Sequence, residues 1–188
     1  MQPIPLAPPI RETLARLEPQ IAGLPTEQLY VIDALGNVVA HRKGGARNVQ
    51  HGAWLTRWMS THPLDFVMVH NHPRGTAHSS RDVMNLFRRY AAESRVVTPQ
   101  GTVYRVQPLV KMPNGPSDLY AYQAALDAAA DDLPKAGRLD HLLELYARGI
   151  ERVRLPSVIR YGKETIARAN PRRTPQMCGC CAEGTDHG

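Results

Sequence analysis

The sequence predicts an α/β protein with a mixed sheet and flanking helices, followed by a helical C-terminal extension. Segments rich in strand formers alternate with segments of helical periodicity through the first 108 residues. One of them, Phe66-Val67-Met68-Val69, is an apolar run typical of a strand buried on both faces. Two pairs of strand-like segments are joined by short connections that contain glycine, as in β-hairpins. This order of helices and strands favours a sheet on which helices pack.

The N-terminal part predicts an arm, a helix and a hairpin. Residues 1–9 contain four prolines and should form an extended arm. Residues 10–17 have apolar side chains at helical spacing, and Pro19 is expected to end that helix. Strand formers in residues 28–32 and 38–41 flank a glycine-containing turn, so these two segments should pair.

The middle of the chain predicts two more helices and a second hairpin. A helix over residues 51–61 should bury one face, on which Trp54 and Trp58 are interpreted as core residues. Another helix is expected after the loop that follows the buried strand. Residues 95–98 and 102–106 then predict two strands joined by a tight connection.

Beyond residue 108 the pattern changes to helices and then to a polar tail. Residues 118–133, 139–147 and 157–169 predict three helices. The tail holds all three cysteines, Cys178, Cys180 and Cys181, and is interpreted as disordered rather than as a site for a soft metal. The expected division is an arm (1–9), a main domain (10–108), a helical extension (109–169) and a tail (170–188).

Length, composition and charge restrict the classes of protein that the chain can belong to. With 188 residues, 43% of them hydrophobic, it can bury one good core. It has no apolar run of about 18 residues and no signal-peptide pattern, so we expect no membrane segment and a cytoplasmic location, or secretion without a cleaved signal. The formal charge is +6, and residues 148–173 hold eight Lys or Arg against two Glu. This stretch is a candidate contact for nucleic acid, and a solvated helix face is the alternative.

A candidate metal site follows the buried strand. His70 and His72 can turn both imidazoles toward one ion, because side chains two residues apart on a strand share a face. Asp82, in the first turn of the next helix, can return a carboxylate to the same end of the strand. Two nitrogens and one oxygen leave a fourth tetrahedral position open for water, which is typical of catalytic zinc. Magnesium and calcium prefer mostly oxygen ligands, so the predicted cofactor is Zn2+.

Hydrolysis by a zinc-activated water also needs a carboxylate that takes and returns a proton. Glu27 is the best candidate because it stands immediately before the strand at residues 28–32, and Glu12 and Glu18 are the reserves. Ser79 could donate a hydrogen bond to the oxyanion that forms as a carbonyl becomes tetrahedral.

These residues carry a resemblance to a known family. A Glu, then His-x-His-Pro, then Ser-x-x-Asp resembles the JAMM motif of JAB/MPN metalloproteases, and His70-Asn71-His72-Pro73 is most similar to RadC-type and phage- or toxin-associated bacterial branches. The resemblance covers residues 26–106. It implies a JAB/MPN domain with a cytidine-deaminase-like layout over residues 10–108.

The resemblance also implies a role for each residue of the motif. His70, His72 and Asp82 would bind zinc, Glu27 would be the general base, and Ser79 would stabilise the oxyanion. The substrate would be a peptide or an isopeptide-linked protein. One departure concerns the loop before Ser79, where six residues follow His72 and the common form of the motif has seven.

Simpler interpretations exist for the same residues. Ser79 and Asp82 stand at the spacing of a capping box, which would need no catalytic role. Glu27 could be an exposed carboxylate beside a strand. His78, in the loop, is interpreted as a solvated histidine, and a fourth ligand or substrate contact is the alternative. For the whole chain, the alternatives to a zinc peptidase are a RadC-like DNA-repair protein or metal-dependent nuclease toxin, and a non-catalytic MPN scaffold.

Overall fold

Nine helices and strands make up the part of the chain that the computed structural model describes, residues 3–45, 51–108 and 159–166. In chain order they are α1 (Pro8–Ile21), β1 (Gln28–Asp33), β2 (Val38–Lys43), α2 (Gly52–Thr61), β3 (Phe66–Asn71), α3 (Ser80–Arg89), β4 (Glu93–Val97), β5 (Thr102–Pro108) and β6 (Ile159–Thr165). The strands form one sheet in the order β2-β1-β3-β4-β5-β6. Only β3 and β4 run parallel, and the other neighbours in this sheet are antiparallel. The predicted α/β class with a mixed sheet is therefore confirmed.

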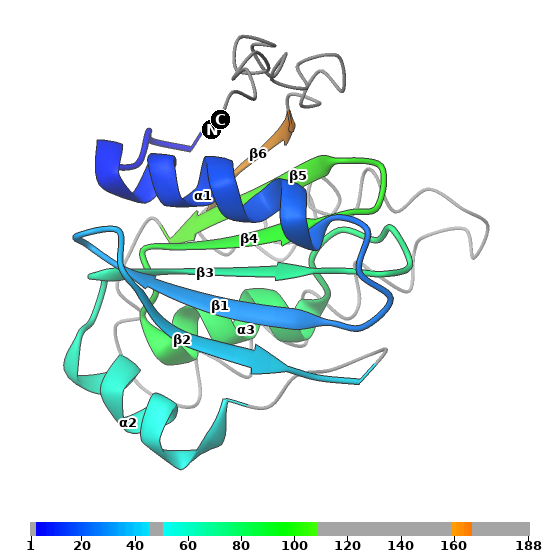
Figure 1. Cartoon of the computed structure of the whole chain (residues 1–188). Helices are drawn as coiled ribbons and strands as arrows, with labels where there is room; N and C mark the ends of the chain where they lie inside the picture. Colours follow the sequence, from blue (N-terminus) through cyan, green and yellow to red (C-terminus); the bar gives the residue numbers. More distant parts are fainter. Residues whose placement is uncertain (1–2, 46–50, 109–158, 167–188) are drawn as a thin grey trace, which may run out of the picture.

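Helices cover both faces of the sheet, α1 on one side and α3 on the other, with α2 beside β2 (Figure 1). Each face has its own apolar core. The core under α1 includes Ile10, Leu14, Leu17, Ile21, Val67 and Val69. The core under α2 and α3 includes Leu55, Met59, Phe66, Met68, Val83, Leu86 and Phe87. Because side chains alternate along β3 and both faces are covered, every residue of β3 is buried, as its apolar run predicts.

The predicted first hairpin is also confirmed, and it positions the start of β1. Asp33 closes the turn, since its Oδ1 accepts hydrogen bonds from the backbone N–H groups of Leu35 (2.9 Å) and Asn37 (2.8 Å). At the other end of the hairpin, Lys43 pairs with Gln28. The first residues of β1 therefore lie between the end of β2 and the end of β3.

The N-terminal prediction was wrong at both ends of the helix. Helix α1 begins at Pro8, inside the predicted arm, because proline is well suited to the first turn of a helix, where its missing N–H has no partner to lose. Pro19 does not end the helix, which continues to Ile21. Pro19 cannot donate to the carbonyl of Ala15, but Ala15 is exposed, so water can reach that carbonyl.

Part of the predicted helical extension is a strand. Residues 157–169 were expected to form a helix, whereas Ile159–Thr165 form β6 and pair with β5 along their whole length. The pairing with β5 outweighs the weak local preference of this segment. The helices predicted at residues 118–133 and 139–147 and the tail at 170–188 lie outside the described residues.

Trp54 is a further correction. Leu55 and Met59 are completely buried, but Trp54 is 57% exposed and is not a core residue. Trp58 is partly buried against the core, with its ring 5.7 Å from that of Phe66. Of the four large apolar side chains of helix α2, Leu55 and Met59 are fully buried, Trp58 is partly buried and Trp54 is exposed.

No helix among the described residues is long and apolar enough to cross a bilayer.

Candidate metal centre

Four segments meet where β3 ends. His70 is the fifth residue of β3, His72 follows the strand, and Asp82 lies in the first turn of α3. Glu27 immediately precedes β1, whose Leu29 is the register partner of His70. The structure therefore brings together Glu27, His70, His72 and Asp82, the four residues for which the sequence predicts a role in metal binding or proton transfer.

The two imidazoles face each other through the same type of nitrogen. His70 Nε2 and His72 Nε2 are 3.1 Å apart. The Nδ1 of His72 lies 3.0 Å from the carbonyl oxygen of Thr76, which can only accept, so in a neutral ring Nδ1 carries the proton. The Nε2 atom of His72 then carries a lone pair, which faces His70 and can bind a cation.

Asp82 contacts both histidines while it caps α3. Its Oδ1 lies 3.5 Å from His70 Nε2, and its Oδ2 lies 3.5 Å from His72 Nε2. The carboxylate is held by Ser79, whose backbone N–H and hydroxyl both donate to Oδ2 at 2.7 Å. In return, the backbone N–H of Asp82 donates to Ser79 Oγ (3.3 Å), which completes a capping box. The same position of the Asp82 side chain therefore caps α3 and brings the carboxylate close to both histidines.

Glu27 is the second carboxylate of the cluster. It is buried, with 6% of its surface exposed, so its interpretation as an exposed carboxylate beside a strand was wrong. Glu27, His70 and His72 each offer one ligand atom, and these three atoms lie within 4.8 Å of one another. This group could hold a metal ion. The reserves are excluded by position, because Glu12 is exposed on α1 and Glu18 forms an ion pair with Arg95.

The two carboxylates have different electrostatic environments. Burial alone would raise the pKa of Asp82, but the charges and hydrogen bonds of His70 and His72 outweigh it and hold that pKa well below its usual value. For Glu27, burial is the larger effect and raises the pKa, although both histidines oppose it. Burial lowers the pKa of His72, but Asp82, Glu27 and the Thr76 backbone together outweigh burial and raise that pKa. At neutral pH Asp82 is thus a fixed anion, whereas Glu27 is closer to exchanging a proton.

The spacing of the two imidazole nitrogens is close to that of two ligands on a small tetrahedral cation, and the Asp82 carboxylate lies beside both. Two ligand atoms bound about 2.0–2.1 Å from a tetrahedral zinc are about 3.3–3.4 Å apart. His70 Nε2 and His72 Nε2 are 3.1 Å apart, His70 Nε2 lies 3.5 Å from Asp82 Oδ1, and His72 Nε2 lies 3.5 Å from Asp82 Oδ2. A lone pair on His72 and an anionic Asp82, both directed at His70, also need a proton or a cation between them. The donor set, two imidazoles and a carboxylate, is suited to zinc.

The structure contains the capping box expected at Ser79, whereas His78 differs from its simplest interpretation. The Ser79 hydroxyl donates to Asp82 in this structure, so Ser79 supports a predicted ligand directly. His78 is completely buried and not solvated, which corrects the interpretation of it as a solvated loop histidine. Its Nε2 lies 3.2 Å from Ser94 Oγ, and its Nδ1 has no hydrogen-bond partner among the described residues. The centroid of its ring lies 6.2 Å from that of the His70 ring, and the two rings are nearly perpendicular.

Three residues near the cluster were not identified from the sequence. Thr76 orients His72 through its carbonyl and its hydroxyl. His51 lies close enough to His70 and Asp82 for their charges to influence its pKa, which burial lowers to about 4. Asn71, which lies between the two histidines in the sequence, is completely buried. A polar residue in a strand that is buried on both faces must find hydrogen-bond partners, and this signal could have identified Asn71.

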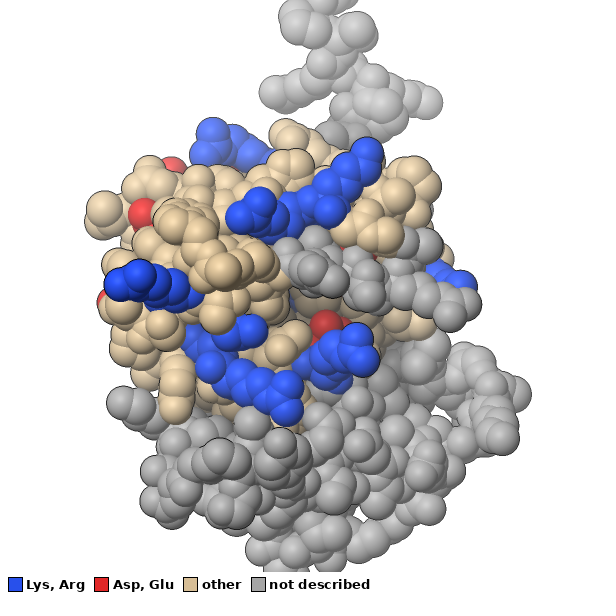
Figure 2. Space-filling view, turned by 90° about the horizontal axis from the view of Figure 1, so that it is seen from below, with Lys and Arg blue, Asp and Glu red and all other residues tan. Residues whose placement is uncertain are grey.

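Basic side chains gather on the face that includes α2 and β2 (Figure 2). Residues 38–90 contain eight Lys or Arg and only two acidic residues, Asp65 and Asp82. The exposed basic side chains of this stretch are Arg42, Lys43, Arg57, Arg74, Arg81 and Arg88. The segment of the chain that carries His70, His72 and Asp82 therefore exposes mainly positive charge.

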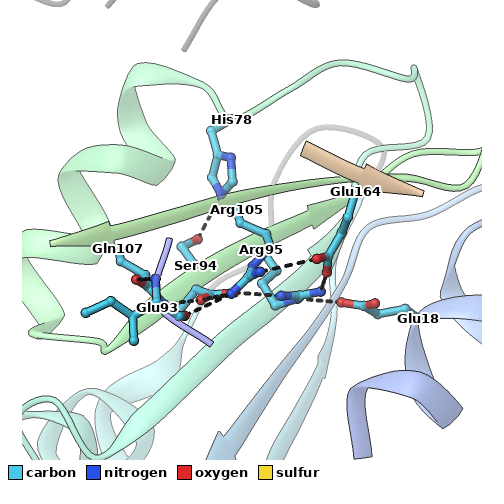
Figure 3. A network of polar contacts seen from close by, with 9 residues as sticks. Glu18, His78, Glu93, Ser94, Arg95, Arg105, Gln107 and Glu164 are labelled. Atoms are coloured by element: carbon cyan, nitrogen blue, oxygen red, sulfur yellow. Dashed lines mark hydrogen bonds and ion pairs between the residues drawn. The ribbon is translucent and has the colours of Figure 1, made fainter. Parts of the chain in front are cut away.

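A second set of charged residues lies on the other face of the sheet, under α1 (Figure 3). Arg95 donates to Glu18 (2.5 Å), Glu93 (2.7 Å) and Glu164, and Arg105 donates to Glu93 and Glu164. These ion pairs connect α1, β4, β5 and β6. A pocket lined by Arg95, Arg105 and Glu164 opens on the same side. Because the two guanidinium groups are already paired with carboxylates, we assign this set a structural role.

Comparison with known proteins adds no relative to this description. No protein-family model, no curated protein and no solved structure matches the chain. The functional conclusion therefore depends on the geometry and chemistry of the cluster itself.

Proposed function

We propose that the chain is a zinc-dependent hydrolase of the JAB/MPN type that cleaves a peptide or isopeptide bond. The observation that carries the proposal is the convergence of His70 Nε2 and His72 Nε2, 3.1 Å apart, with the Asp82 carboxylate, whose Oδ1 and Oδ2 each lie 3.5 Å from one of the two nitrogens. The order of the motif residues along the chain, with Glu27 first, supports the same family.

The two carboxylates take different roles in this proposal. Asp82 is the third ligand, because its low pKa keeps it anionic and its oxygens contact both histidines. Glu27 is the general base, because burial raises its pKa toward the range in which a carboxylate both accepts and returns a proton near neutral pH. When bound, zinc supplies a Lewis acid that acidifies a coordinated water and polarises a carbonyl. Glu27 would accept a proton from the attacking water and return it to the leaving amine.

Ser79 has two tasks in this mechanism. Its backbone N–H and hydroxyl orient Asp82 in the free protein. To donate to an oxyanion, the hydroxyl must turn away from Asp82, whose Oδ2 would still accept from the Ser79 backbone N–H at 2.7 Å. The capping box therefore leaves the ligand supported while the hydroxyl serves the substrate.

Glu27→Gln tests the proposal, with Glu12→Gln as the matched control because Glu12 is exposed on α1 and lies outside the cluster. Both variants should retain zinc, and Glu27→Gln should lower turnover of peptide and isopeptide substrates by about 100-fold or more, the usual contribution of a general base. Full activity of Glu27→Gln would show that the assigned base is wrong. Loss of zinc from Glu27→Gln would instead make Glu27 a ligand.

A second candidate is a nucleic-acid-directed metal enzyme, which the exposed basic side chains of residues 38–90 favour. Arg42, Lys43, Arg81 and their neighbours could neutralise phosphates. The same zinc-loaded protein should then cleave DNA or RNA and not peptides, and its nucleic-acid affinity should fall steeply with salt. Zinc-dependent peptide cleavage with weak binding of nucleic acid would exclude this candidate.

A further inference from the structure

Asn71 lies between His70 and His72 in the sequence, but its side chain makes its hydrogen bonds to the segment before β1. Its side chain is completely buried. The Oδ1 atom accepts a hydrogen bond from the backbone N–H of Gln28 at 2.7 Å, and Nδ2 donates to the carbonyl oxygens of Leu24 (3.2 Å) and Thr26 (3.1 Å). Both amide protons and one lone pair of Asn71 are thus used on the segment between α1 and β1. This segment carries Glu27.

These contacts occur where β1 separates from β3. The register of the two strands ends at the pair Leu29 and His70. One residue further, the N–H of Gln28 donates to the Asn71 side chain. The backbone of β3 continues instead along β4, where Asn71 is the partner of Val97 and the N–H of His72 donates to the Val97 carbonyl at 2.9 Å. The Asn71 side chain therefore bridges the gap that opens between the two strands at the cluster.

The bridge determines where Glu27 stands. Thr26 and Gln28, the residues on either side of Glu27, are both held by Asn71. The backbone of Glu27 is also held by the two residues that follow β2, since its N–H donates to the carbonyl of Gly45 (3.0 Å) and its carbonyl accepts from the N–H of Gly44 (2.8 Å). With the backbone fixed on both sides, only the side-chain torsions remain to place the carboxylate near the histidines.

We propose that Asn71 is a positioning residue that holds the Glu27 carboxylate at the metal centre by bridging β3 to the segment before β1. The inference depends on the proposed role of Glu27 as general base. Neither aspartate nor leucine, which are close to asparagine in size, reproduces its three bonds. Aspartate keeps the acceptor but loses both donors and turns a negative charge toward two carbonyl oxygens, and leucine keeps the size but makes none of the bonds.

The test compares Asn71→Leu, and the milder Asn71→Ser, with Gln107→Leu. Gln107 is a matched control because it is also a buried amide with three hydrogen bonds, two to the backbone of Ile4 and one to Glu93, in β5 on the α1 side of the sheet. All variants should still bind about one Co2+ or Zn2+ per chain, with an unchanged visible spectrum for Co2+, because the ligands are not altered. Only the Asn71 variants should lower kcat, by about 10–100-fold with a smaller change in KM.

A double-variant experiment separates positioning from a general loss of stability. If Asn71 acts through Glu27, then Asn71→Leu should change kcat/KM by less than about twofold when Glu27→Gln is already present. Multiplicative effects of the two substitutions would overturn the inference, as would an equal loss of kcat in Gln107→Leu.

A readout that needs no activity distinguishes this inference from the proposed function. Hydrogen exchange of the Gln28 amide in the metal-free protein should become at least tenfold faster in Asn71→Leu and stay unchanged in Gln107→Leu. If wild type neither binds zinc nor turns over substrate, the proposed function fails, whatever the exchange result. If wild type is active and Asn71→Leu leaves both the exchange of Gln28 and kcat unchanged, the positioning role fails alone.

Discussion

Glu93 should be among the most sensitive positions in the described part of the fold. It is completely buried, and its carboxylate accepts four hydrogen bonds, two at Oε1 from Arg95 and Arg105 and two at Oε2 from Arg105 and Gln107. Glu93→Gln keeps the size of the side chain but removes the charge and turns an N–H toward these donors. Leaving buried guanidinium groups without a charged partner costs about 3–5 kcal/mol. Glu18 and Glu164 still pair with Arg95, so we expect a loss of about 3–4 kcal/mol.

Urea unfolding followed by circular dichroism measures this loss. At an m-value of about 2 kcal/mol/M, the midpoint of Glu93→Gln should fall by about 1.5–2 M. Glu164→Gln is the control, because the Glu164 side chain is 42% exposed and should contribute less than about 1 kcal/mol. Zinc content should not change in either variant, since these carboxylates lie on the face opposite the histidines. A midpoint for Glu93→Gln that is no lower than that of Glu164→Gln would refute the reasoning.

Two further predictions concern pH. Burial lowers the pKa of His78 to about 3 in the folded chain, against about 6.5 in the unfolded chain. Between these two pH values the unfolded state binds more protons than the folded state. The free energy of unfolding therefore falls as the pH falls through this window. Between pH 7.5 and 5 the metal-free wild type should lose about 2 kcal/mol that His78→Leu does not lose, and parallel stability profiles of the two proteins would contradict this. For the zinc-loaded enzyme, the acid limb of the kcat profile should be absent in Glu27→Gln, because Glu27 is the group that must be ionised to accept the proton.

The sequence predicts most of the sheet because its signals are local. The apolar run of β3, the two hairpins and the capping box of α3 each depend on residues that are close together along the chain, and the structure contains all of them. The strand β6 was predicted as a helix because its stability comes from pairing with β5, more than 50 residues earlier in the sequence. Trp54 was assigned to the core because helical periodicity gives the direction of a face but not how wide the covering layer is.

In the candidate site, too, local features could be predicted and contacts between residues distant in sequence could not. His70, His72 and Asp82 are close in sequence, so strand alternation and the start of a helix are sufficient to predict that they converge. Glu27 was assigned from its place before β1, and its distance from the histidines depends on the register of β1 with β3. The contacts of Asn71 with Leu24, Thr26 and Gln28 join residues more than 40 positions apart, and no periodicity reports them. The burial of His78 likewise depends on how α3 packs on the sheet.

Metal content measured by native mass spectrometry tests the central claim most directly. Wild type, His72→Ala and His41→Ala should be prepared in parallel with zinc and then dialysed, His41 being an exposed histidine on β2 outside the cluster. We predict about one zinc per chain for wild type and His41→Ala, and loss of most of it in His72→Ala, because a ligand has been removed. Equal zinc in wild type and His72→Ala, or none in wild type, would contradict the assignment of His70, His72 and Asp82 as a metal centre.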